Sequence, residues 1–342
     1  MNRLRVAACL LAVIAAASVG ARAPAPALDE QALLKELGFS AQDLLKIGRG
    51  EIIGRTTQAD SSAVALVVAG TIAVPSVYYL EKFRAIESFK KTAEVLQIGR
   101  VNGAPSPADF AALTLDQADV DDLKDCRVGD CGVKLDADGV ARLARRDAQA
   151  ASATAEMRQY LAGYAQQYLQ RGNGALMEYR DNSRPRRVAD ELRVILDHSR
   201  FLQRGWPTLH TAVGAFTGTM PDGLDHFVYW SKEKIGPRAV ISLTHAIIRP
   251  PSEGVAAIAT KQIFASHYST GSLGMTMLLD KGTPEAPRTL IVYVNRSRLD
   301  IFGGILGTIK RPLVRSRARD GAERMMRQLR DRLERDYRKA GL

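Results

Sequence analysis

Alternating apolar and polar positions fill five segments in the last third of the chain, and one long helical pattern follows them. The segments are Phe227–Lys232, Arg238–Ile248, Val255–Tyr268, Leu273–Leu279 and Thr289–Arg296. A period of two residues predicts half-buried strands. From about Leu313 to Arg338 the apolar residues recur at three- and four-residue steps, which predicts one amphipathic helix. We therefore expect an α+β fold in which a curved antiparallel sheet grips a long C-terminal helix, with an apolar cavity between them.

The same alternation predicts an earlier strand over Val64–Val74, interrupted at Gly70. Pro75 begins a predicted helix that runs to Lys91, and Val95–Val101 is a second predicted strand. The predicted organisation is a signal peptide over 1–27, an N-terminal helical segment over 28–60 and a first part of the sheet domain over 61–103. A largely helical insertion over 104–207 follows, with its strongest helical pattern over Asp138–Gln170, and residues 208–342 complete the sheet domain.

The start of the chain has the pattern of an export signal. Arg3 and Arg5 precede Val6–Val19, in which only Ser18 is polar, and small residues up to Ala27 offer cleavage sites. We expect a periplasmic or secreted protein with its signal peptide removed; an uncleaved N-terminal anchor is the alternative.

Two cysteines remain in the expected mature chain, in the segment Cys126-Arg127-Val128-Gly129-Asp130-Cys131. In an oxidising compartment this spacing predicts a local disulfide, with free thiols as the alternative. We predict no metal site, because the five histidines lack the spacing that places two ligands on one helix face. No cofactor is expected either.

The net charge of +11 lies mostly at the C-terminus. Residues 308–342 hold 12 Lys or Arg against 5 Asp or Glu, a net charge of +7. A basic helix face can attract an anionic membrane surface, although a solvated outer face is the simpler interpretation. Nucleic acid is not expected as a partner of an exported protein.

The order of elements resembles the helix-grip fold of the START-like, polyketide-cyclase and lipid-transfer superfamily. The features that carry the resemblance are the strand Val64–Val74 entering a helix at Pro75, the strands from Phe227 to Arg296, and the glycine-containing lead-in from Gly303 to Gly307. The resemblance covers about Ala63–Lys91 and His226–Arg338. It implies an apolar ligand, such as a lipid, sterol or polyketide, held between the sheet and the last helix.

Several side chains are candidates for lining such a cavity, and ordinary core packing is the alternative for each. They are Tyr229, His245, His267, Met275, Met277, Tyr293 and Met325, with Met326 beside the last of them. Methionines give an adaptable apolar lining, and tyrosines add a polar group. Arg296 and Arg298 are candidates for binding an anionic headgroup, or for a structural ion pair with Glu233 or Asp300.

The function that these patterns predict is binding or carriage of an apolar or amphipathic, lipid-like molecule. One alternative is a hydrolase- or cyclase-like enzyme with His245 or His267 as acid or base, although a satisfied core histidine and a hydroxyl-rich turn are the simpler explanations of these two. The other alternative is an envelope interaction protein that uses its Arg-rich helix.

Overall fold

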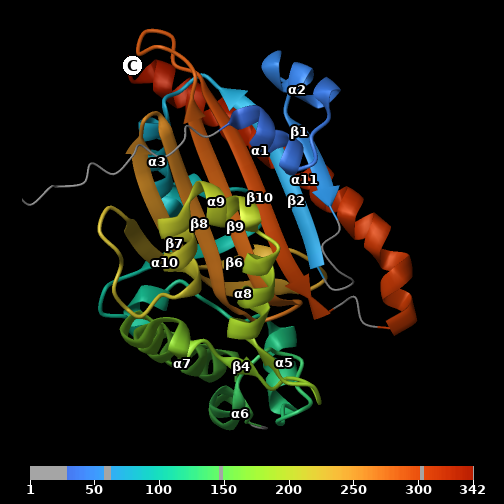
Figure 1. The fold of residues 1–342 in the computed structure, drawn as a ribbon. Coiled ribbons are helices and arrows are strands. Elements are labelled where there is room, and N and C mark those ends of the chain that lie inside the picture. The colour runs from blue at the N-terminus through green and yellow to red at the C-terminus, as the bar shows by residue number, and fades with distance from the viewer. Residues whose placement is uncertain (1–28, 58–62, 146–148, 301–303, 342) are drawn as a thin grey trace, which may run out of the picture.

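The computed structural model describes residues 29–57, 63–145, 149–300 and 304–341, and within the last helix it describes side chains from Ser316 onward. Its centre is one antiparallel sheet of eight strands in the order β1-β2-β10-β9-β8-β7-β6-β3 (Figure 1). These strands are β1 Ile53–Thr57, β2 Ala63–Ile72, β3 Val95–Val101, β6 Asp225–Lys234, β7 Ala239–Ser252, β8 Val255–Ala265, β9 Ser269–Asp280 and β10 Thr289–Leu299. A separate small pair is formed by β4 Glu178–Tyr179 and β5 Arg186–Arg187.

The helices come from both ends of the chain and from the middle. They are α1 Glu30–Glu36, α2 Ala41–Gly48, α3 Ser76–Arg84, α4 Ile86–Phe89, α5 Gln117–Lys124, α6 Ala137–Leu143, α7 Ala150–Arg171, α8 Val188–Asp197, α9 Arg200–Gly205, α10 Pro207–Gly214 and α11 Gly304–Lys339, with short 3-10 turns η1 Pro107–Phe110 and η2 Gly172–Ala175. None of the helices in the described ranges is long and apolar enough to cross a bilayer.

Helices cover both faces of the sheet. On the face turned to the viewer in Figure 1, α1, α2 and α8 to α10 pack on one parity of the central strands, including Met275 and Met277. On the far face, α3, α4 and α11 pack on the other parity, including Ile258 and Leu278. A third core joins α5 to α7 with β3 and β6 to β8 around Trp230. Where helices cover both faces, the central strands are apolar on both parities.

The prediction of an α+β fold with a large antiparallel sheet and a C-terminal helix is confirmed. The segment over 28–60 is not wholly helical, because it contains β1, which pairs with β2 at the sheet edge. The stretch over 104–207 is largely helical, as predicted. The helix predicted from Asp138 to Gln170 is divided into α6 and α7.

The C-terminal helix is longer than the pattern predicted. It begins at Gly304, so the glycine lead-in from Gly304 to Gly307 is helical instead of a loop. Its main sheet contacts are with β1 and β2, at one edge of the sheet. Met326 and Leu333 are the buried residues of its inner face. In the part described, α11 therefore packs chiefly on the β1–β2 edge and leaves the middle of the far face to other elements.

The end of α7 depends on a glycine. Gly172 has φ +58°, and a Cβ at this position would lie 1.9 Å from the Phe216 carbonyl oxygen. We expect Gly172→Ala to lower the free energy of unfolding by about 1–3 kcal/mol, since the backbone must shift as well as adopt a disfavoured conformation.

Gly163 provides a matched control in the same helix, because a Cβ added at this position would have no neighbouring atom within 4 Å. Gly163→Ala is expected to raise the free energy of unfolding by about 0.5–1 kcal/mol. Urea unfolding of both variants measures the difference. A Gly172→Ala protein as stable as the wild type would contradict the close approach to Phe216.

Candidate functional site

Polar side chains replace apolar ones along the far face of the sheet. Towards one end of the strands this face carries Phe227, Ile258, Leu278 and Ile291, which pack against α3, α4 and α11. Towards the other end the same parity carries hydroxyl and amide groups. We call six of these the polar patch: Thr260, Gln262, Ser272, Thr276, Tyr293 and Asn295. They come from the three neighbouring strands β8, β9 and β10.

Strand register places the members of the polar patch side by side. Thr276 lies opposite Tyr293 on β10, and Ser272 lies opposite Gln262 on β8. All six residues keep partly accessible surface, although β8, β9 and β10 are interior strands of the sheet. On the other face of the same strands, Met275, Met277 and Val292 are buried. The polar patch is therefore a reachable surface in the middle of the sheet.

Hydrogen bonds link the side chains at the end of the patch nearest Ser297. The Ser297 hydroxyl donates to Asn295 Oδ1 at 2.7 Å, and the Asn295 amide donates to Ser272 Oγ at 3.2 Å. Ser272 Oγ also lies 2.8 Å from Ser297 Oγ. These groups are uncharged and can both donate and accept, so the patch suits hydroxyl, amide or ether groups of a ligand.

One ion pair borders the patch. Lys90 Nζ donates to Glu233 Oε1 at 2.6 Å and lies 5.3 Å from the centre of the Tyr229 ring. Burial opposes the charged form of Glu233, but Lys90 and the Ser231 hydroxyl outweigh it and lower the pKa of this carboxyl. The two side chains remain 27% and 20% exposed. A charged pair is thus held within reach of a ligand.

Burial is also the main influence on the pKa of Tyr293, which it raises. The same side chain keeps accessible surface. Tyr293 is therefore closely surrounded by protein atoms, while part of its surface stays accessible.

The predicted cavity residues are distributed over several places. Tyr293 belongs to the polar patch and Tyr229 lies beside Lys90. Met275 and Met277 lie on the opposite face, against α1, α2 and α8 to α10. Met325 is 58% exposed on α11, and it is Met326 that is buried. The expected methionine lining shared by sheet and helix is therefore wrong, because alternation gives the parity of a residue but not the element that covers it.

His245 is a satisfied core residue on the face away from the patch. Its Nδ1 lies 2.7 Å from the Tyr168 hydroxyl, and its Nε2 lies 3.0 Å from His226 Nδ1. Burial lowers the pKa of His245 well below its ordinary value, and the charges of Lys261 and His226 act in the same direction.

His267 does have an acidic partner. Its Nε2 lies 3.1 Å from Asp119 Oδ1, and both side chains are buried. Arg238 also contacts Asp119. The Ser266 hydroxyl accepts from the Ile241 amide, and among the described residues no hydrogen bond joins this hydroxyl to the His267 ring. His245 and His267 do not converge on the polar patch.

Arg296 and Arg298 also lie on the face away from the patch. Arg298 forms an ion pair with Glu191 of α8, instead of with Glu233 or Asp300. The Arg296 Nε is buried and has no hydrogen-bond partner in the described part of the chain, and burial lowers the pKa of this side chain. A headgroup role for these arginines beside Tyr293 is excluded by their placement.

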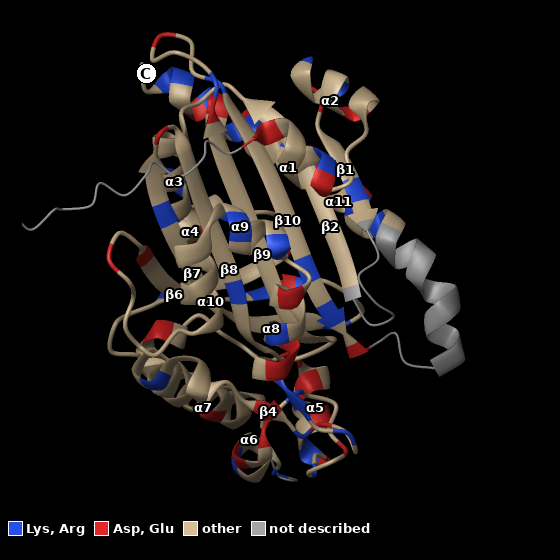
Figure 2. Ribbon diagram, viewed as in Figure 1, with Lys and Arg blue, Asp and Glu red and all other residues tan. Residues whose placement is uncertain are grey.

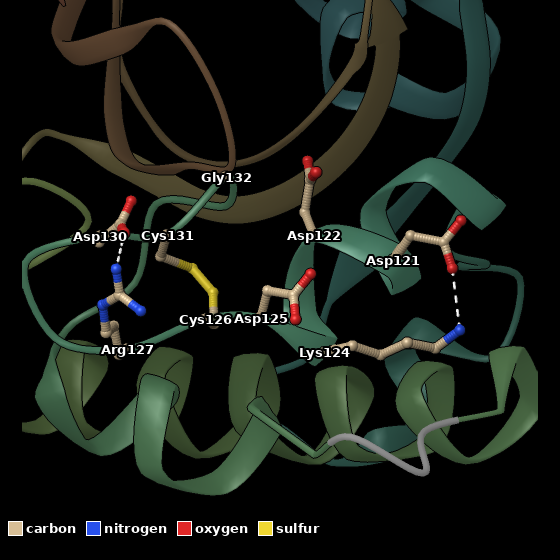
Figure 3. Close-up of a pocket in the computed structure, with 9 residues that line it drawn as sticks. All are labelled: Asp121, Asp122, Lys124, Asp125, Cys126, Arg127, Asp130, Cys131 and Gly132. Atoms are coloured by element: carbon tan, nitrogen blue, oxygen red, sulfur yellow. Dashed lines mark hydrogen bonds and ion pairs between the residues drawn. A yellow bond between two sulfur atoms is a disulfide. The ribbon is translucent and has the colours of Figure 1, made fainter.

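Two hollows in the described surface lie away from the patch. One of about 620 Å³ adjoins the disulfide between Cys126 and Cys131, whose Cα atoms are 4.4 Å apart (Figure 3). Carboxylates dominate it, but Lys124 and Arg127 pair with two of them, Asp121 and Asp130. Within the described ranges no group of His, Cys, Asp and Glu could hold a metal ion. The other hollow, of about 460 Å³, lies between α8 and α10.

The strands are mostly uncharged in Figure 2, and charged residues gather at strand ends and on helices. On α11, Arg327 donates a hydrogen bond to the Ile52 carbonyl, and Arg330 donates one to the Gly50 carbonyl. Arg324 and Arg335 are exposed. Part of the basic surface of α11 therefore forms hydrogen bonds that attach the helix to the segment just before β1.

Sequence reasoning missed Lys90, Lys261 and Asn173. Lys261 could have been identified as buried from the sequence, because it lies on the same strand parity as the apolar residues Ala257 and Ala259, which are buried.

No protein-family model, curated protein or solved structure matches this chain. The functional argument therefore rests on geometry.

Proposed function

We propose that the protein binds an amphipathic small molecule on the polar patch of the sheet, as a carrier or receptor in the periplasm or outside the cell. The observation that carries the proposal is the accessible row of polar side chains on interior strands, directly continuous with an apolar surface. Polar groups that stay open to water on interior strands can exchange that water for hydrogen bonds to a ligand.

The two parts of the far face suit the two parts of an amphipathic ligand. Hydroxyls and amides of Ser272, Tyr293 and Asn295 bind an uncharged polar portion, and Lys90 with Glu233 can receive a charged or zwitterionic group. Apolar contact with the adjoining Ile258 and Leu278 surface contributes about 25 cal/mol per Å² buried. The ligand expected is more polar than a sterol or an unmodified acyl chain.

The order of elements supports the helix-grip resemblance as part of this proposal. Strand β2 leads into α3 and α4, strands β6 to β10 lead into α11, and all three helices pack on the face that carries the patch. In that superfamily the ligand lies between the sheet and the last helix. The same face is the ligand side here.

Export is the second part of the proposal. The disulfide between Cys126 and Cys131 is of a kind that persists in oxidising compartments. The predicted signal over 1–27 lies outside the described residues.

Native mass spectrometry of the exported protein, together with organic extraction of its co-purified material, tests the proposal. We expect a stoichiometric adduct whose extract contains an amphipathic molecule with hydroxyl, amide or zwitterionic groups. A clean mass without adduct, and no binding when the host's polar lipid extract is added back, would contradict the carrier function.

A further inference from the structure

Among the described residues, three lysines are almost completely removed from solvent, and one of them differs from the other two in its hydrogen-bond and ion-pair partners. Lys134 and Lys232 are each 2% exposed, and Lys261 is 0% exposed. Lys134 pairs with Asp181 at 2.9 Å and also with Asp300, and Lys232 pairs with Asp116 at 2.6 Å. Among the described residues, no carboxylate contacts Lys261. A buried ammonium ordinarily requires such a partner.

The surroundings of Lys261 consist of neutral acceptors and aromatic rings. Its Nζ donates to Asn173 Oδ1 at 2.6 Å and to the Val213 carbonyl at 3.0 Å. It lies 5.2 Å from the centre of the Tyr168 ring and 5.5 Å from that of Phe216. Burial lowers the pKa of Lys261 to about 7. A large fraction of the amine is therefore unprotonated, and nucleophilic, near neutral pH.

Asn173 separates this amine from a surface hollow. The hollow, of about 460 Å³, is lined by Asn173 and by residues of α8 and α10, among them Arg193, His210 and Ala215. Its volume is within the range of small-molecule sites. Asn173 Nδ2 donates to the carbonyls of Val213 and Gly214 at 3.1 and 2.8 Å, so the proposal requires a rotation of this side chain that breaks these bonds and brings Nζ into contact with a molecule in the hollow.

Groups that can relay protons adjoin the amine. His245 is the cross-strand partner of Lys261 in the register of β7 and β8. Hydrogen bonds link Tyr168, His245 and His226, and His226 is only partly buried. The chain of three side chains therefore leads from the interior beside Lys261 towards solvent.

We propose that Lys261 is a nucleophile that condenses reversibly with a small aldehyde or ketone bound in the hollow between α8 and α10. The Nζ lone pair forms a bond to the carbonyl carbon, and the carbonyl oxygen is protonated as Nζ loses a proton, which gives a carbinolamine. That oxygen then leaves as water, and an imine remains. No oxidant or reductant is consumed. The site faces away from the polar patch, so the inference is independent of ligand binding there.

Reductive labelling tests this assignment. The full exported protein is treated at neutral pH with limiting propanal and sodium cyanoborohydride, which fixes imines as propylated lysines, and each lysine is then followed by peptide mapping. We expect Lys261 to be labelled at least about tenfold faster than Lys134 and Lys232, because carboxylates contact these two side chains and none contacts Lys261 among the described residues.

Two variants accompany the labelling. Lys261→Arg keeps a cation but no primary amine, and it should lose the fast label. Ala215→Phe fills the hollow and should slow labelling of Lys261 but not of Lys134. Labelling of Lys261 no faster than that of Lys134 and Lys232 overturns the assignment. Fast labelling that Ala215→Phe leaves unchanged overturns the route through the hollow.

Discussion

Replacing Lys261 with methionine is expected to stabilise the protein by about 2 kcal/mol near neutral pH, and to remove a rise in stability with pH. The wild-type amine has a pKa of about 7 in the folded state and an ordinary value of 10.5. Between these values the unfolded chain binds more protons than the folded one, so wild-type stability increases with pH across this window. Methionine fills the same space between Tyr168 and Phe216 without a buried charge.

Urea unfolding between about pH 7 and pH 9 measures this effect, since above this range the tyrosines of the unfolded chain ionise while burial raises the pKa of Tyr164 and Tyr293 in the folded state. The wild type should gain up to about 2 kcal/mol across this window, while Lys261→Met should stay nearly flat, so that the two curves approach each other at the alkaline end. His245 titrates outside this window, because burial lowers its pKa from an ordinary value of 6.5. A wild-type curve as flat as that of the variant would show that Lys261 is not the isolated buried amine described here.

Glu191→Gln is expected to destabilise the protein by about 3 kcal/mol. The Glu191 carboxylate contacts Arg298 and lies 3.7 Å from Arg186. The side chains of Glu191 and Arg298 are 9% and 14% exposed, so the substitution removes a negative charge that contacts a largely buried guanidinium. Thermal or urea unfolding measures the loss.

Glu178→Gln is the matched control, because Glu178 also lies between two arginines but its pairs with Arg180 and Arg187 are more exposed. The decrease in the free energy of unfolding should be much smaller for Glu178→Gln than for Glu191→Gln. The double variant Glu191→Leu with Arg298→Leu should recover stability relative to Glu191→Gln, since both buried charges are removed. Equal losses for Glu191→Gln and Glu178→Gln would contradict the description of this ion pair.

The strands were predictable because their apolar residues alternate over long runs, as in β7 and β9. Strand β1 was missed because Ile53–Thr57 contains a single large apolar residue and lies at the sheet edge, where pairing with β2 fixes it. The break between α6 and α7 was also missed, since their apolar positions form nearly one helical series.

The candidate site was predictable only in part. Tyr229 and Tyr293 were selected for their chemistry, and they lie at and beside the polar patch. Met275 and Met277 were predicted to face the C-terminal helix, but other helices from distant parts of the sequence cover their face of the sheet. The polar parity of β8 to β10 looks in sequence like an ordinary solvent face; only the sheet order shows that these strands lie in its interior.

Native mass spectrometry of two tryptophan variants tests most directly that the polar patch holds the ligand. Ser272→Trp places an indole at the end of the patch nearest Ser297, while Ser252→Trp makes the same change at the exposed end of β7. Both variants are compared with the wild type for adduct and extractable amphiphile. Loss of the adduct in Ser272→Trp, with full retention in Ser252→Trp, is the predicted result. An adduct that persists at wild-type stoichiometry in folded Ser272→Trp would contradict binding at the patch.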